Sequence, residues 1–126
     1  MFETRTIMST DVVAVKRDTP VRDVIDLIVT KDITGIPVVN DDGTLAGIVT
    51  ERDILSLLAD VRYATGPVEQ YMTRDVVAFD VEEDFIAICE CVTKNHFRRV
   101  PILSEGKLVG IVSRSDIIKY ITSPLG

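Results

Sequence analysis

Short apolar runs alternate along the chain with longer amphipathic segments. Asp11 to Lys16 is a brief Val-rich stretch that predicts a β-strand. Thr19-Pro20 follows and predicts a helix start, with Thr19 as the N-cap and Pro20 at the first helical position. The helix that they introduce has its apolar residues at helical spacing on one face, namely Val21, Val24, Ile25 and Ile28.

Two apolar strands and a second helix are predicted next. We expect the strands at Ile36 to Val39 and at Leu45 to Val49, on either side of the turn Asn40-Asp41-Asp42-Gly43. The helix is expected from Thr50 to Ala59. The first half of the chain is therefore predicted to run in the order strand, helix, strand, strand, helix.

The same order recurs in the second half, because Met8 to Val15 returns as Met72 to Phe79, 64 residues later. Ile36-Pro37-Val38 returns as Val100-Pro101-Ile102 at the same offset. The expected elements of this copy are a strand at Asp75 to Phe79, a helix with Phe85, Ile88, Cys89 and Val92 on one face, strands at Val100 to Leu103 and Lys107 to Val112, and a helix at Ser113 to Ile121.

The offset falls to 63 between Gly47-Ile48-Val49-Thr50 and Gly110-Ile111-Val112-Ser113, so one residue is lost in the turn between the two apolar strands. A unit of about 60 residues buries little apolar surface alone, so we expect the two copies to pack face to face about a pseudo-twofold axis. The prediction is an α+β protein with repeats at 6–60 and 68–122 and a linker at 61–67.

Composition adds limits on the class of protein. Of 126 residues, 46% are hydrophobic and 27% are charged, which is typical of a globular chain. The formal charge of −6 argues against binding to nucleic acid, and no apolar run approaches the length that a membrane span requires. The chain begins without a secretory signal, so we expect a cytoplasmic protein in which Cys89 and Cys91 are free thiols.

The repeated motifs carry a resemblance to a known family. Met-(Ser/Thr)-x-Asp-Val-Val, then Ile-Pro-Val or Val-Pro-Ile, a Gly turn and Gly-Ile-Val-(Thr/Ser)-x-x-Asp occur in this order in both copies. The pattern resembles a tandem pair of CBS domains, also called a Bateman module, over roughly residues 6 to 122. The resemblance implies a regulatory module of two stacked β-α-β-β-α units whose two clefts, in many members, bind adenosine-containing ligands.

The clearest candidate residues open the last helix of each copy, in Thr50-Glu51-Arg52-Asp53 and Ser113-Arg114-Ser115-Asp116. Their spacing fits a helix cap, with the hydroxyl accepting from a backbone N–H and the carboxylate favoured by the helix dipole. The resemblance implies a second role, in which Thr50 and Ser113 hold phosphate while Asp53 and Asp116 accept from ribose hydroxyls. The two roles are compatible.

A basic stretch distinguishes the second copy. Arg98 and Arg99 precede its first apolar strand, whereas Thr34 and Gly35 occupy these places in the first copy. In related modules a basic residue here reaches the ligand phosphates, and guanidinium suits an oxyanion. The alternative is a solvated basic turn. If the arginines bind phosphate, the two sites are unequal.

The resemblance also assigns the wall that holds the adenine base, by backbone hydrogen bonds and apolar side chains. This wall falls on Thr10 to Val13 and Thr73 to Val77, with core packing as the alternative role of the valines. The residues concerned are Thr10, Val12, Val13, Thr73, Val76 and Val77.

Catalytic and metal sites have little support. The chain has one histidine, His96, and no nucleophile elbow or glycine-rich phosphate loop. Cys89 and Cys91 are two positions apart on a predicted helix, so they point away from a shared metal. We therefore expect no enzyme, no metal and no cofactor other than an adenine nucleotide as a regulatory ligand.

The sequence thus predicts a module that senses AMP, ADP or ATP and acts on an unidentified regulated protein. The alternatives are a constitutive dimerisation module with empty clefts, or binding of S-adenosylmethionine, whose sulfonium would not seek Arg98 and Arg99. We also expect a homodimer through the helices after Thr50 and Ser113, which carry more apolar positions than one buried stripe requires. These positions are Ile54, Leu55, Leu57, Leu58, Ile117, Ile118 and Ile121.

Overall fold

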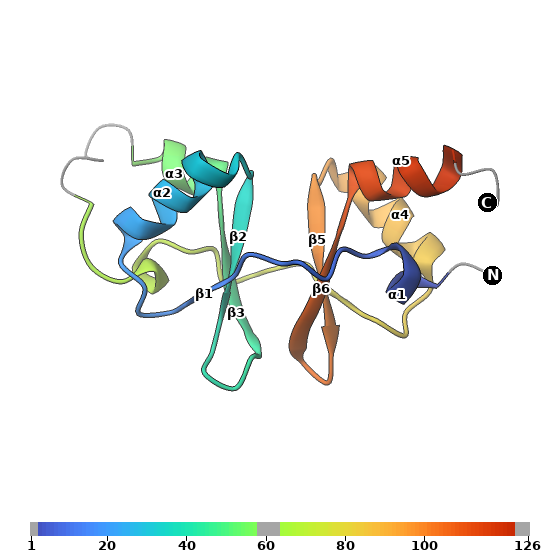
Figure 1. The fold of residues 1–126 in the computed structure, drawn as a ribbon, viewed down its shortest axis with the longest axis horizontal. Helices are drawn as coiled ribbons and strands as arrows, with labels where there is room; N and C mark the ends of the chain where they lie inside the picture. Colours follow the sequence, from blue (N-terminus) through green and yellow to red (C-terminus); the bar gives the residue numbers. More distant parts are fainter. Residues whose placement is uncertain (1–2, 58–63, 123–126) are drawn as a thin grey trace. The chain divides into compact units, whose positions relative to one another are not determined.

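The structure, a computed structural model, describes residues 3–57 and 64–122, which form two compact units (Figure 1). The first unit is Val13–Val76, and the second unit combines Met1–Val12 with Val77–Gly126. Their boundaries differ from those of the sequence repeats. The opening residues of each repeat pack with the remainder of the other repeat.

Each unit contains a three-stranded sheet covered by helices, in which the first strand is parallel to the second and the second is antiparallel to the third. The elements of the first unit are β1 (Val15–Lys16), α2 (Val21–Lys31), β2 (Gly35–Val39), β3 (Leu45–Thr50), α3 (Glu51–Leu55) and the 3-10 helix η2 (Val68–Gln70). Those of the second are α1 (Thr4–Ile7), β4 (Phe79–Asp80), α4 (Phe85–Asn95), β5 (Arg99–Ser104), β6 (Lys107–Ser113) and α5 (Arg114–Thr122). The predicted order of elements and the α+β class are confirmed.

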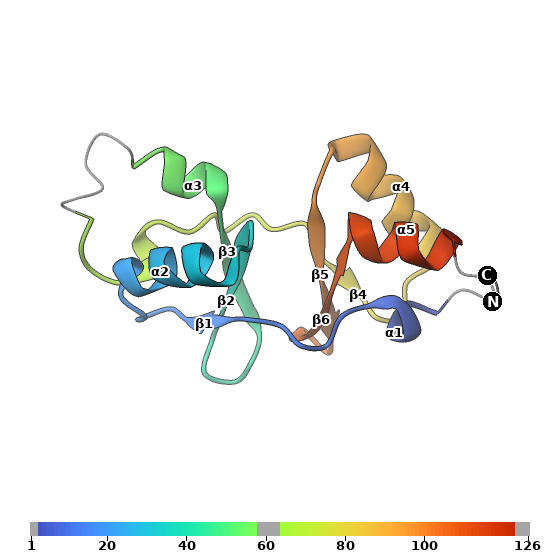
Figure 2. The same cartoon turned by 45° about the horizontal axis from the view of Figure 1, so that its top comes forward.

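The apolar helix faces expected from the sequence form the two cores. In α2, Val21 and Val24 are completely buried, and Val24 packs with Ile36 and Val49 of the sheet. In the second unit the buried residues of α4 pack with those of β5 and β6, namely Phe85, Ile88, Val92, Val100, Ile102 and Val112. In Figure 2, α2 and α4 each lie beside the sheet of their own unit. Helical spacing of apolar residues therefore identified the core-facing side of both helices.

The hairpins of the two units account for the lost residue. In the second unit Ser104 pairs with Lys107, so the turn is only Glu105 and Gly106, at φ 53° and 80°. Two successive residues with positive φ are typical of the tight hairpin turn that glycine favours. In the first unit the turn is longer, and the Asn40 backbone N–H donates to the Thr44 carbonyl at 2.8 Å. The predicted place of the length change is confirmed.

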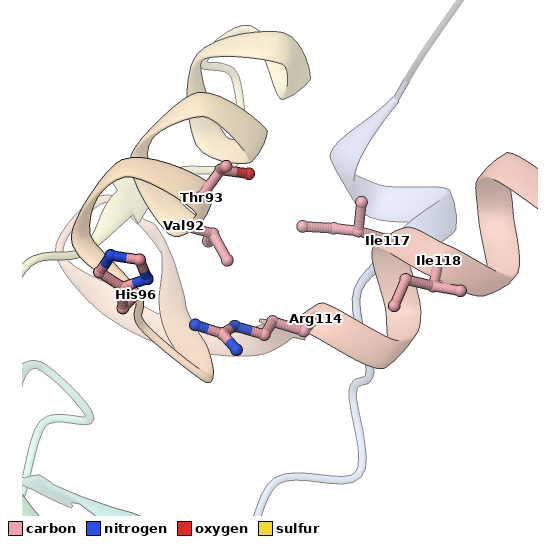
Figure 3. A pocket seen from close by; sticks show the side chains of 6 residues that line it. All are labelled: Val92, Thr93, His96, Arg114, Ile117 and Ile118. Carbon is pink, nitrogen blue, oxygen red and sulfur yellow. The ribbon is translucent and has the colours of Figure 1, made fainter.

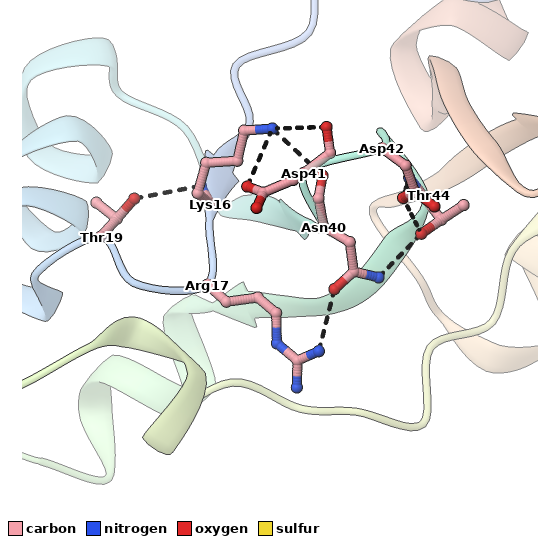
Figure 4. Close-up of polar contacts among 7 residues, drawn as sticks. All are labelled: Lys16, Arg17, Thr19, Asn40, Asp41, Asp42 and Thr44. Atoms are coloured by element: carbon pink, nitrogen blue, oxygen red, sulfur yellow. Dashed lines mark hydrogen bonds and ion pairs between the residues drawn. The ribbon is translucent and has the colours of Figure 1, made fainter.

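A polar network ties the end of β1 to the longer hairpin (Figure 4). Lys16 Nζ donates to the carbonyl oxygens of Asn40 and Asp41, at 3.3 and 3.4 Å. Arg17 donates through one terminal nitrogen to Asn40 Oδ1 and through Nε to Glu69 Oε2, both at 3.0 Å. These two cations are thus engaged inside the first unit and fix a two-residue strand against its neighbour.

The strands predicted at Asp11 to Lys16 and Asp75 to Phe79 are shorter and later in the structure, as β1 and β4. The residues before them pair elsewhere. Ser9 forms an antiparallel bridge with Ile111 of β6, and Thr73 forms one with Ile48 of β3. Because these bridges use the free edge of the third strand, the Met-(Ser/Thr) motif of each repeat extends the sheet of the other repeat.

Two predicted helix boundaries are wrong. Helix α2 begins at Val21 with Pro20 as its N-cap, and the Thr19 hydroxyl accepts from the Lys16 backbone N–H at 3.2 Å instead of capping the helix. Helix α3 ends at Leu55, with Ser56 as its C-cap. The last two residues of the helix expected to Ala59 lie outside the described residues.

Two short elements, α1 and η2, were not predicted, because each lacks enough residues to show a periodic pattern. The expected linker at 61–67 lies partly outside the described residues. Its final part is held in place, since the Val21 backbone N–H donates to the Gly66 carbonyl at 3.0 Å and Val68 N–H donates to the Thr19 carbonyl at 2.7 Å. None of the helices in residues 3–57 and 64–122 combines the length and apolar composition needed to span a bilayer.

Candidate functional site

Thr50 and Asp53 form a reciprocal cap at the start of α3. The Asp53 backbone N–H donates to Thr50 Oγ1 at 3.4 Å, and the Thr50 backbone N–H donates to Asp53 Oδ2 at 2.9 Å. These bonds satisfy groups that a helix end leaves without partners. The capping role predicted from the sequence is therefore confirmed for this pair.

Ser113 and Asp116 make the same arrangement at the start of α5. Asp116 N–H donates to Ser113 Oγ at 3.2 Å, and Ser113 N–H donates to Asp116 Oδ2 at 2.9 Å. Both aspartates are half-buried, so their carboxylates are held in place and still reach solvent. The helix caps thus present an oriented carboxylate at the same position in each unit.

The structure brings Arg98 and Arg99 to the second of these caps. Arg99 lies directly opposite Ser113 in the β5–β6 register, and the Arg114 backbone N–H donates to the Arg98 carbonyl at 3.0 Å. Residues opposite each other in antiparallel strands place their side chains on one face, with Cβ atoms about 4.5–5.5 Å apart. Four predicted ligand-binding residues, including Asp116, are therefore neighbours in the second unit.

The equivalent cap of the first unit has a different charge. Gly35 lies opposite Thr50, and the Glu51 backbone N–H donates to the Thr34 carbonyl at 3.0 Å. Glu51 stands where the second unit has Arg114, and Gly35 where it has Arg99. The sequence difference noted at Arg98 and Arg99 thus extends to the first residue of each helix, so the two caps differ in sign.

The arginines of the second unit are held differently from one another. Arg114 Nε donates to the Phe97 carbonyl at 2.8 Å. Arg98 is exposed, whereas Arg99 is half-buried and its Nε is buried without a hydrogen-bond partner among the described residues. A buried unsatisfied donor is unfavourable, particularly on a charged group. An acceptor brought to the Arg99 guanidinium would offset that cost.

Thr73 contacts the Asp53 carboxylate, although the sequence suggested that it would line an adenine base. Its hydroxyl donates to Asp53 at 3.0 Å from Oδ1 and 3.3 Å from Oδ2. The backbone of Thr73 is fixed to Ile48 by two hydrogen bonds, at 2.8 and 2.9 Å. No sequence signal indicated this contact, because Thr73 and Asp53 belong to different repeats.

The other residues expected to line the base are divided between the units. Thr10, which is exposed, and the half-buried Val12 lie in the second unit, and the half-buried Val76 lies in the first. Val13 packs against the core of the first unit, which supports its structural role. Val77 is 44% exposed and is free to contact a ligand or another surface.

A cavity of about 360 Å³ opens on the second unit between α4 and α5 (Figure 3). Its lining comes from the end of α4 and the first turns of α5, namely Val92, Thr93, His96, Arg114, Ile117 and Ile118. The sequence did not predict this cavity. Val92, Ile117 and Ile118 give the cavity an apolar surface, with Arg114 and His96 at one side. Ile118 is 60% exposed.

Cysteine and metal chemistry gain no support from the structure. Both cysteines are free, as predicted. Burial raises the pKa of the Cys89 thiol, and the negative charge of Asp84 raises it further. Residues 3–57 and 64–122 contain no group of three or more His, Cys, Asp or Glu side chains placed to hold a metal ion.

Comparisons with known proteins agree with this architecture. The sequence model of the CBS domain matches residues 5–60 and 68–123. A crystal structure of CBSX2 in complex with AMP has a TM-score of 0.86 and 27% identity, and the similarity covers 96% of each chain.

Curated relatives are longer than this chain. The uncharacterized protein MJ1225 of Methanocaldococcus jannaschii is 35% identical over 94% of this chain and 42% of its own length. Inosine-5'-monophosphate dehydrogenase of the same organism is 37% identical over 86% of this chain, but over only 21% of the enzyme. The chain therefore spans less than half the length of these two relatives.

Proposed function

Because this chain belongs to the CBS-domain family, with two copies of the domain, we propose that it is a regulatory module that senses adenine nucleotides. The ligand class is AMP, ADP or ATP. The AMP complex of the similar CBSX2 structure supports this choice. Both cysteines are free thiols, which fits action in the reducing cytoplasm on a regulated protein that is yet to be identified.

The observation that carries the proposal is the half-buried Asp116 carboxylate beside a cluster of arginines. A carboxylate held by its helix cap accepts hydrogen bonds from the two vicinal hydroxyls of ribose. Arg98 and Arg99 adjoin the same cap and supply bidentate donors for phosphate. Ser113 Oγ and the positive end of the nine-residue α5 add further attraction for an anion.

The first unit offers the same ribose acceptor with less attraction for phosphate. Asp53 stands at the cap of α3, but Gly35 and Glu51 replace the cations of the second unit. We expect a diphosphate or triphosphate to favour the second unit. The first unit is expected to bind weakly or to take an adenosine ligand with less charge.

The arginines also separate a nucleotide from S-adenosylmethionine. The sulfonium of S-adenosylmethionine is a cation, so Arg98 and Arg99 would repel it where they attract a phosphate. A thermal-unfolding panel with adenosine, AMP, ADP, ATP and S-adenosylmethionine tests this ranking. A ligand at 100 times its Kd should add about 2.7 kcal/mol to native stability. Stabilisation by S-adenosylmethionine alone, or by none of the five, would contradict the proposal.

A second candidate function, as a homodimeric interaction module, rests on exposed apolar side chains. Leu55 of α3 is 60% exposed, and Ile118 and Ile121 of α5 are 60% and 71% exposed. Leu57 is half-buried, whereas Leu58 lies outside the described residues. Large exposed apolar side chains on a helix of each unit favour association with another chain. Sensing and dimerisation are compatible, and empty sites would leave dimerisation as the sole function.

A further inference from the structure

The carboxylates of Asp53 and Asp116 differ in the hydrogen bonds that they already receive. Asp53 accepts from the Thr50 backbone N–H at 2.9 Å, from the Thr50 hydroxyl at 3.2 Å and from the Thr73 hydroxyl at 3.0 Å. Thus three donors occupy a group that offers about four lone-pair sites. Little capacity remains for a further ligand at Asp53.

The Asp116 carboxylate receives fewer hydrogen bonds than that of Asp53. Among the described residues its carboxylate accepts only from the Ser113 backbone N–H, at 2.9 Å. The Ser113 hydroxyl faces the Ser115 hydroxyl instead, at 3.0 Å. Ser9 occupies the place of Thr73 in the repeat, and within the described residues its hydroxyl makes no bond to Asp116. Asp116 therefore has room for two more donors.

We propose that Thr73 is a specificity-determining residue that closes the Asp53 carboxylate, meaning that its hydroxyl occupies an acceptor site that a vicinal diol would need. Within residues 3–57 and 64–122 the Asp116 carboxylate has no such donor and can accept from both hydroxyls of a diol. This inference rests on the proposed nucleotide function. Two ribose hydroxyls at Asp53 would raise the number of hydrogen-bond donors to five, whereas the carboxylate offers about four acceptor sites. One of the donors from the protein must therefore give up its bond to Asp53. At Asp116 the same two hydroxyls bring the donors to three, and nothing has to move.

Thr73 is the one donor to Asp53 that lies outside the Thr50–Asp53 helix cap, so it can leave without disturbing that cap. The Thr50 backbone N–H is part of the helix cap, and its loss would expose an unpaired group at the start of α3. The Thr73 residue is exposed, so its hydroxyl can rotate and bond to water. Its backbone bonds to Ile48 need not change, because only the side chain turns. Ribose binding at Asp53 thus breaks one contact between residues of different repeats.

The inference gives a specific pattern of sugar preference. AMP presents two ribose hydroxyls to Asp53, whereas 2'-deoxy-AMP presents one, which fits the single remaining site beside Thr73. Because Thr73 is exposed and its hydroxyl can bond to water instead, losing its hydrogen bond to the carboxylate costs only about 0.5–1.5 kcal/mol, which lowers AMP affinity about 2- to 12-fold at Asp53. The 2'-deoxy nucleotide should escape this loss.

Calorimetry on two single-site backgrounds tests the inference. The Asp116→Asn variant retains the Asp53 site, and the Asp53→Asn variant retains the Asp116 site. In the first background Thr73→Val, which removes the hydroxyl at similar volume, should raise AMP affinity about 2- to 12-fold and leave 2'-deoxy-AMP affinity unchanged. The matched control, Ser9→Ala in the second background, should change neither. Thr73→Ser should restore the affinities of the background protein.

The outcomes separate the inference from the function on which it rests. If AMP binds and Thr73→Val leaves its affinity unchanged or lowers it, Thr73 does not close Asp53 and the inference is wrong while nucleotide sensing stands. An equal gain for AMP and 2'-deoxy-AMP also overturns it, because the diol is then irrelevant. If AMP binds to neither background nor to the unmodified protein, the proposed function fails and the inference fails with it.

Discussion

Gly47 and Met72 pack so closely that a Cβ atom added at Gly47 would lie 2.7 Å from Met72 Sδ and 2.7 Å from the Thr73 carbonyl oxygen. The second contact is with backbone, which cannot rotate away. Gly47 therefore lets the Met72–Thr73 segment lie against β3, where Thr73 pairs with Ile48. This close approach explains why the Gly-Ile-Val motif begins with glycine, which the sequence pattern alone did not explain.

Replacing Gly47 with alanine should destabilise the first unit. Overpacking of this kind costs about 1–3 kcal/mol, measurable as a lower urea midpoint. Gly110→Ala should cost less, because the nearest backbone oxygen, that of Ser9, is at 3.0 Å and the two closer atoms, at 2.5 and 2.9 Å, belong to the flexible Met8 side chain. Gly35→Ala, where the nearest atom is at 3.2 Å, is the milder control. Equal stability of the Gly47→Ala variant and the parent would contradict this account.

Most of the fold could be predicted because its main elements have periodic patterns. Val21, Val24, Phe85 and Ile88 lie on the buried faces that helical spacing assigned to them. The caps at Thr50 and Ser113 could also be predicted, since they depend on residues only three positions apart. Local signals were sufficient for these helix faces and for these two caps.

The exchange of the Met-(Ser/Thr) segments could not be predicted. Bridges such as Ser9 with Ile111 join positions about a hundred residues apart and involve a single pair of residues, so they leave no periodic trace. The contact of Thr73 with Asp53 follows from the same exchange. The Thr19 cap was wrong because Thr19 has a competing local partner in the Lys16 backbone N–H.

Removing Arg98 and Arg99 should weaken nucleotide binding in proportion to the number of phosphates. The double alanine variant should lose most affinity for ATP, less for AMP and almost none for adenosine, and its binding should depend less on salt. Calorimetry at two salt concentrations measures both effects. Lys94→Ala with Lys107→Ala removes the same charge from exposed positions in the second unit and should have little effect. The structure has already replaced the alternative of a solvated basic turn, because Arg99 is half-buried in β5, so unchanged ATP affinity without the arginines would mean that they do not bind phosphate.

Association into a homodimer should depend on the exposed face of α5. Sedimentation velocity at micromolar concentration should show the parent as a dimer and the variant with Ile118→Glu and Ile121→Glu as a monomer, because buried carboxylates without partners are strongly unfavourable. Ile86→Glu is a matched control, since Ile86 is 44% exposed but lies in the first turn of α4. A monomeric parent would contradict the prediction.

The Cys89 thiol should make stability depend on pH in the alkaline range. Burial, and then the charge of Asp84, raise the pKa of Cys89 above its ordinary value of 9.0. Unfolding lowers that pKa again, so this contribution to stability is present below pH 9.0 and is lost as the pH rises through the folded-state pKa. Urea unfolding of Cys89→Ala should therefore show a flatter alkaline decline than the parent or Cys91→Ala. Identical declines in all three proteins would contradict this.

The central claim, that the oriented aspartates hold the ribose of an adenine nucleotide, is tested most directly by titrating AMP into the parent and into Asp53→Asn with Asp116→Asn. Loss of a charge-assisted pair of hydrogen bonds costs about 1.5–3 kcal/mol, which corresponds to a fall in affinity of about 10- to 150-fold at each site. The asparagine side chain retains an acceptor for the cap, so stability should fall much less. The account predicts tight AMP binding by the parent and this loss in the double variant. Absence of AMP binding by the parent, or equal affinity in the two proteins, would contradict it.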